Sequence, residues 1–163
     1  MKTLLIVATL VLSLASPFAV AHGDEGHGAK QEQNAGGHAA AIGKPGDPAK
    51  VSRTVAVEMS DAMRYIPAKI KVKRGETIKF VVHNNGTVKH EMVLGTIKEL
   101  KEHAVLMQKF PEMEHVDPNM VSVEPGKTGE LLWQFTRAGT FTFACLQPGH
   151  FEAGMVGKVA VGR

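Results

Sequence analysis

The chain has 163 residues, of which 44% are hydrophobic and 21% charged, and its formal net charge is +3 at pH 7. This composition predicts one modest globular domain with a hydrophobic core. A charge this small, without basic clusters, gives no indication of nucleic-acid binding, so that class of partner is not expected.

The first 21 residues have the pattern of a cleavable export signal. Lys2 gives a positive start, the apolar run "LLIVATLVLSLA" follows, and Ala19 and Ala21 form an Ala-x-Ala cleavage pattern. A membrane anchor is the alternative, but the run is too short to span a bilayer comfortably. We expect cleavage after Ala21 and no membrane span. Lys2 is the only charged residue of this segment, so its removal would lower the charge from +3 to +2.

Residues 22–50 are predicted to form a flexible tail. They are rich in Gly, Ala and polar residues and show no hydrophobic period, so they cannot bury enough surface to offset the entropy lost on ordering. The three histidines of this tail, His22, His27 and His38, either capture metal ions weakly or do nothing in a soluble tether.

From Val51 to Arg163 apolar residues recur with a period of two, which predicts β-strands. The runs lie around residues 55–59, 70–72, 78–82, 90–94, 131–135, 141–145 and 159–161. Turn signals such as "RGE", "NNG" and "EPGKTG" separate them. Many short alternating strands with Gly and Pro turns indicate an all-β fold, an antiparallel β-sandwich.

One inserted helix is predicted at residues 97–109. Thr96 followed by Glu99 is a capping-box signature, and Pro111 ends the run. The apolar stripe expected to pack on the sandwich consists of Ile97, Leu100, Ala104 and Met107.

The stretch "CLQPGHFEAGM" contains the only cysteine, Cys145, followed by His150 and Met155 at even spacing. A thiolate, an imidazole and a thioether are donors that select copper over magnesium or calcium. Cys145 shares its parity with Phe141 and Phe143, so its sulfur should point into the sandwich at the end of a strand. The following loop supplies His150 and Met155.

A fourth ligand should come from a neighbouring strand. His90 is the best candidate, because it begins a predicted strand and shares its inward parity with Met92 and Leu94. His83 and His115 are the alternatives. Two imidazoles, one thiolate and a weak axial thioether would form a blue-copper-type site.

These residues carry a resemblance to a known family. The chain from about Val51 to Arg163 resembles a cupredoxin, and "FACLQPGHFEAGM" is similar to the signature loop of that family. The resemblance implies a Greek-key β-sandwich with one mononuclear type 1 copper ion, held by the four metal ligands His90, Cys145, His150 and Met155. The histidine-containing tail, the helix and the extra methionines look most like the periplasmic cupredoxins of bacterial copper tolerance, which implies a periplasmic location.

Glu91 departs from the family pattern, in which Asn or Ser often follows the first histidine. Its parity is opposite to that of His90, which favours an exposed strand residue or a hydrogen-bond acceptor behind the ligands over an extra ligand. The insertion is also rich in groups that suit Cu(I), which suggests either a second, weaker copper site or ordinary packing. These residues are His103, Met107, Met113, His115 and Met120.

Two functions use the same four ligands. The protein either binds copper for tolerance, or carries electrons between periplasmic partners that dock on an apolar rim near Pro148, Phe151 and Ala153. The expected partners are a redox protein or a copper donor or acceptor, bound transiently to a monomer. An enzyme is not expected, because a full ligand set leaves no open position for a substrate.

Overall fold

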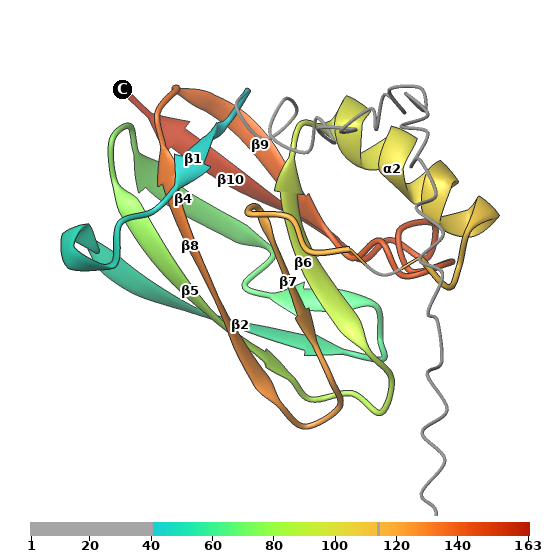
Figure 1. The fold of residues 1–163 in the computed structure, drawn as a ribbon. Coiled ribbons are helices and arrows are strands. Elements are labelled where there is room, and N and C mark those ends of the chain that lie inside the picture. The colour runs from blue at the N-terminus through green and yellow to red at the C-terminus, as the bar shows by residue number, and fades with distance from the viewer. Residues whose placement is uncertain (1–40, 114) are drawn as a thin grey trace, which may run out of the picture. The chain divides into compact units, whose positions relative to one another are not determined.

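The computed structural model describes residues 41–113 and 115–163 (Figure 1). The predicted export signal and the tail histidines His22, His27 and His38 lie outside the described residues. The tail and the cleavage after Ala21 therefore stay predictions.

The described residues form a sandwich of two five-stranded sheets, which confirms the predicted all-β fold (Figure 1). In spatial order, the first sheet consists of β1 (Gly43–Pro45), β8 (Thr128–Phe135), β5 (Thr77–Asn84), β2 (Arg53–Ser60) and β3 (Arg64–Ile66). The second consists of β4 (Lys69–Lys73), β10 (Val156–Gly162), β9 (Gly139–Ala144), β6 (His90–Gly95) and β7 (Met120–Val123).

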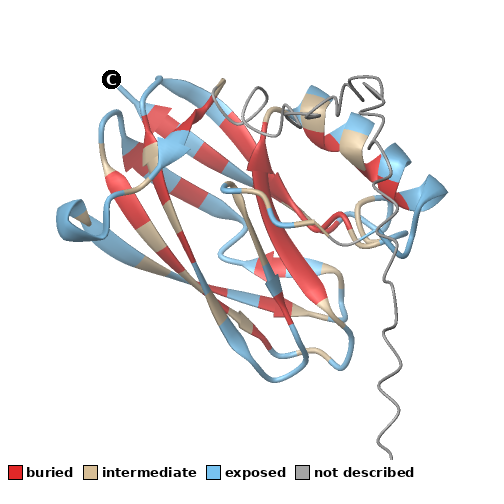
Figure 2. Ribbon diagram, in the orientation of Figure 1, coloured by how far each residue is buried: buried red, intermediate tan, exposed pale blue. Residues whose placement is uncertain are grey.

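The core lies between the sheets and is filled by the alternate residues that the period-two pattern selects. In β5, Ile78, Phe80 and Val82 are all fully buried. Phe143, from the second sheet, belongs to the same cluster and meets Tyr65 edge-on, with ring centroids 4.9 Å apart. Figure 2 shows buried residues alternating with intermediate ones along β5 and with mostly exposed ones along β4 and β10. Such interdigitation makes the sandwich a stiff support for groups at its rim.

Both sheets are mixed, whereas the sequence predicted antiparallel pairing. β2 runs parallel to β5, and β4 runs parallel to β10. The chain leaves the first sheet after β3, adds β4 to the second sheet, and returns as β5 in the direction of β2. A strand with one buried face alternates in the same way whether its neighbour is parallel or antiparallel, so the sequence pattern could not distinguish them.

Residues 41–50, which were expected to belong to the flexible tail, are ordered. Gly43–Pro45 pairs with β8, a 3₁₀ turn follows at Pro48–Lys50, and Ile42 is fully buried in the core. Gly43 permits the close approach, since a Cβ there would lie 2.0 Å from the Gln134 carbonyl oxygen. A three-residue strand with one apolar anchor is too short to show a hydrophobic period.

The predicted helix is confirmed as α2 (Ile97–Lys109), with both hydrogen bonds of its capping box present between Thr96 and Glu99. Leu100, Ala104 and Met107 are buried against a second cluster that includes Ala144 and Leu146, whereas Ile97 is 47% exposed. The helix therefore covers the outer side of β6 and β9 (Figure 1). Among the described residues, no helix is long and apolar enough to cross a membrane.

Candidate metal centre

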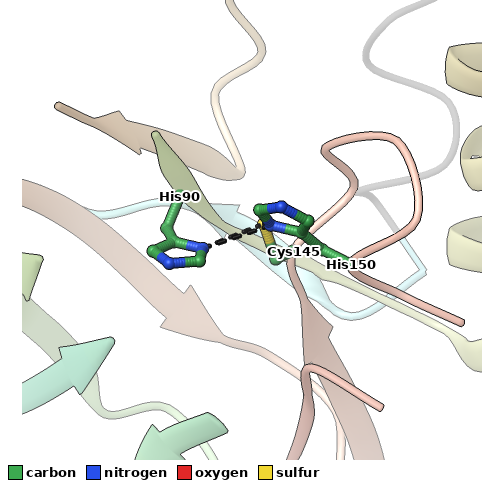
Figure 3. A group of neighbouring side chains, drawn as sticks. All are labelled: His90, Cys145 and His150. Carbon is green, nitrogen blue, oxygen red and sulfur yellow. Dashed lines mark hydrogen bonds between the residues drawn. The ribbon is translucent and has the colours of Figure 1, made fainter. Parts of the chain in front are cut away.

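Three of the four predicted ligands converge at one end of the sandwich (Figure 3). Cys145 Sγ lies 3.2 Å from His150 Nδ1 and 3.9 Å from His90 Nδ1, and the two imidazole nitrogens are 3.2 Å apart. The three donor atoms all lie within 4.8 Å of one another. One metal ion could therefore contact all three, and a thiol with two imidazoles is a donor set that suits copper.

The thiol is placed by β9 and buried by the core. Cys145 directly follows this strand and is fully buried, as its parity with Phe141 and Phe143 predicted. The Glu91 backbone N–H donates a hydrogen bond to its sulfur over 3.3 Å. Burial raises the pKa of Cys145 to about 12, although backbone hydrogen bonds from Gln147 and Glu91 act in the opposite direction. Without a metal the group is a neutral thiol at neutral pH.

His90 is the first residue of β6 and is fully buried. Its Nε2 lies 3.1 Å from Asp61 Oδ1. The Thr87 backbone N–H and hydroxyl donate to the other oxygen of Asp61 and, as the main cause, lower the pKa of that carboxyl group to about 2. Asp61 is therefore an anion at neutral pH that accepts the Nε2 proton, which leaves the Nδ1 lone pair facing Cys145.

Gly86 allows the Asp61 carboxylate to reach this loop. A Cβ on Gly86 would lie 2.0 Å from Asp61 Oδ1, so a larger residue would push the carboxylate away from His90.

His150 and Met155 lie on the loop between β9 and β10, which backbone hydrogen bonds close. The Met155 N–H donates to the His150 carbonyl over 3.0 Å, and the Cys145 N–H donates to the Met155 carbonyl over 3.1 Å. The Met155 side chain is fully buried in the cluster that contains Cys145. Arg64, from β3 of the opposite sheet, donates to the Ala153 carbonyl over 3.1 Å. The loop is thus held at both ends, and Met155 as fourth ligand stays a prediction.

Glu91 is buried and not an exposed strand residue, which corrects the first of the interpretations offered for it. Its Oε1 accepts hydrogen bonds from Ser122 over 2.9 Å and from Gln147 over 2.7 Å. Its carbonyl accepts a hydrogen bond from the buried Tyr65 hydroxyl. Glu91 thus links β6 and β7 to the ligand loop, which is the role of an acceptor behind the ligands.

The other predicted candidates lie elsewhere. His83 Nδ1 is 2.8 Å from the Thr128 hydroxyl on β8 and takes no part in the three-residue group. Met107 lies on the inner face of α2 and is buried in the second hydrophobic cluster, between the helix and the sheet. Met120 packs against that cluster. His115 and Met113 line a separate cavity beside the helix.

Sequence reasoning missed the residues that position the ligands. Asp61 lies in the turn between β2 and β3, and Arg64 is the first residue of β3. Ser122 lies in β7, and Gln147 lies on the ligand loop, so only the fold brings the four residues to the site. The turn residues of "SDAM" gave a local signal for Asp61, but nothing linked that position to His90.

A family model described as copper binding proteins of the plastocyanin/azurin family matches residues 51–162. The chain belongs to this family. Copper-resistant cuproprotein CopI of Rubrivivax gelatinosus is 53% identical over 161 residues, which cover 96% of this chain and 97% of that protein. Copper-resistant cuproprotein CopI of Pseudomonas aeruginosa is 38% identical and covers 76% of this chain and 84% of its own.

A solved structure supports the fold independently of sequence. Reduced auracyanin of Roseiflexus castenholzii superposes with a TM-score of 0.60 at 19% identity, covering 69% of this chain and 99% of its own. Because the sequence identity is only 19%, this structural similarity supports the fold alone. Together with the family match, it confirms the resemblance to cupredoxins drawn from the signature loop.

Replacing Glu91 should loosen the ligand loop without removing a ligand. Glu91→Ala removes the shared acceptor of the exposed Ser122 and the half-buried Gln147. We expect the free energy of unfolding to fall by about 0.5–1.5 kcal/mol for each hydrogen bond lost. Chemical denaturation measures this, with Glu58→Ala on the exposed side of β2 as a control expected within about 0.5 kcal/mol of wild type. Unchanged stability with complete loss of copper binding would instead make the carboxylate a ligand.

Metal binding should release a proton from Cys145. The raised thiol pKa means that loading at pH 7–9 displaces the thiol proton, so affinity should rise about tenfold per pH unit in this range. Burial lowers the pKa of His150, so that imidazole is already neutral there and adds no second proton. Titration in weakly buffered solution with a pH indicator measures the release. Cys145→Ser serves as the control, and release of no proton by the wild type would contradict the expectation.

Proposed function

We propose that this protein binds one copper ion at a type 1 site and serves copper tolerance in the periplasm. The observation that carries the proposal is the convergence of Cys145 Sγ with the Nδ1 atoms of His90 and His150 within 4.8 Å. The names of the CopI relatives, which describe copper-resistant cuproproteins, support the role in tolerance.

The residues present fit the metal. The three donors face one another, and Asp61 fixes the proton of His90 on the nitrogen that points away from Cys145. Met155 would supply the fourth, weaker donor from the closing turn of the loop. Copper held by these groups would supply one-electron redox chemistry at the sandwich rim.

The chain itself contributes stiffness and shielding. Cys145, His90 and Met155 are fully buried, so water is excluded from most of the site, while His150 is only partly buried. The hydrogen bond from the Glu91 N–H to the sulfur stabilises the deprotonated form that metal binding requires.

Electron transfer is the second candidate function, and the partial exposure of His150 favours it, because one ligand reaches the surface. The apolar rim expected for docking is smaller than the sequence suggested. Phe151 packs partly against the cluster under α2, which leaves Pro148 and Ala153 as its exposed members.

Replacing Cys145 tests the proposal. Cells lacking the gene should become copper-sensitive, and wild-type protein should restore growth where Cys145→Ser does not. The purified variant should lose the intense thiolate-to-Cu(II) absorption band, while the matched control His83→Gln keeps both the band and the rescue. Circular dichroism checks that each variant folds. If a folded Cys145→Ser protein that lacks the absorption band restored full copper tolerance, this site would not be responsible for the tolerance.

A further inference from the structure

A cavity of about 600 Å³ lies beside the metal centre, between the end of α2, the segment that follows it, and strands β6 and β7. Its walls include Met107 of α2, Met113 and His115 of the following segment, and Glu91, Ser122 and Gln147. Gln147 lies on the ligand loop, so the cavity shares a wall with the site at Cys145 but contains none of its four predicted ligands.

His115 is the unusual residue of this cavity. Both of its ring nitrogens are buried and have no hydrogen-bond partner. Asp117 Oδ2 lies 3.4 Å from Nε2, without hydrogen-bond geometry, and the His103 ring stacks at a centroid distance of 4.7 Å. Ring nitrogens buried without hydrogen-bond partners lose their hydration, and a bound ligand would compensate that loss. The carboxylate beside Nε2 favours a proton there and a free lone pair on Nδ1.

Two methionines, Met107 and Met113, line the same cavity as His115. Met107 is 3% exposed, and its packing between α2 and the sheet is enough to explain a methionine at that position. Met113 is 40% exposed, so packing does not explain a methionine there. Two thioethers and an imidazole are the soft and borderline donors that suit Cu(I).

The charges around the cavity also favour a cation. Glu91 and Glu112 face it together with one ammonium group, that of Lys89. Glu91 Oε1 already accepts from Ser122 and Gln147, so its charge acts at a distance and the soft donors would make the contacts.

We propose that this cavity is a second metal site, which binds a soft monovalent ion of the Cu(I) class through Met107, Met113 and His115. The identity of the ion as copper rests on the proposed function, whereas the preference for a soft monovalent cation rests on the donors themselves. A site of this kind next to the ligand loop would hold an additional ion close to the main centre.

Ag(I), a redox-inert probe with the same donor preference, tests the site. Full-length protein labelled in its methionine methyl groups is titrated with silver ions and followed by NMR. We expect the methyl signals of Met107 and Met113 to shift and saturate together. His115→Gln combined with Met113→Leu should weaken this binding at least tenfold.

The controls separate this proposal from the main site. His83→Gln and Met63→Leu, which lie outside the cavity, should leave the shifts unchanged. In Cys145→Ser the Met107 and Met113 signals should still move, which reports on the cavity even if the main site fails. Movement of Met155 alone, or a shift of the Met107 signal that persists in the double variant, would overturn the proposed second site.

Discussion

A buried sulfur with two imidazole nitrogens close to it is the feature on which the rest of the structure depends. Such a thiol is protonated at neutral pH, because burial raises the pKa of Cys145 to about 12. It becomes a useful donor only if a metal ion displaces its proton and neighbouring groups stabilise the charge that remains. The fold meets this need with the Glu91 N–H, which donates to the sulfur, and with His90 and His150, whose Nδ1 atoms face it.

The two sheets and the inserted helix hold these groups in place from different sides. Asp61 anchors His90 from the first sheet, and Arg64 holds the ligand loop from the same sheet. On the opposite side α2 covers β6 and β9, so the strands that carry His90 and Cys145 are buried on both faces near the site. Within the second sheet, Glu91 joins β6 to β7 through Ser122 and to the ligand loop through Gln147. The inserted helix α2 thus helps to hold the strands at the metal centre in place.

The sequence predicted the elements well because their signals are local. The helix bounds 97–109 and its capping box agree with the structure, and the parity of Cys145 placed its sulfur in the core. The contacts of Asp61 with His90 and of Glu91 with Gln147 could not be predicted, because they join residues 29 and 56 positions apart through the packing of separate elements. The short strand β1 was not predicted for another reason, because three residues are too few to show a hydrophobic period.

The most direct test asks whether one ion is held jointly by the sulfur of Cys145 and by the imidazoles of His90 and His150. X-ray absorption at the copper edge, on protein loaded with a single equivalent, measures the donor atoms directly. The expected result is one short copper–sulfur distance together with two copper–nitrogen distances from imidazole. A first shell of nitrogen and oxygen alone, without short sulfur, would contradict it.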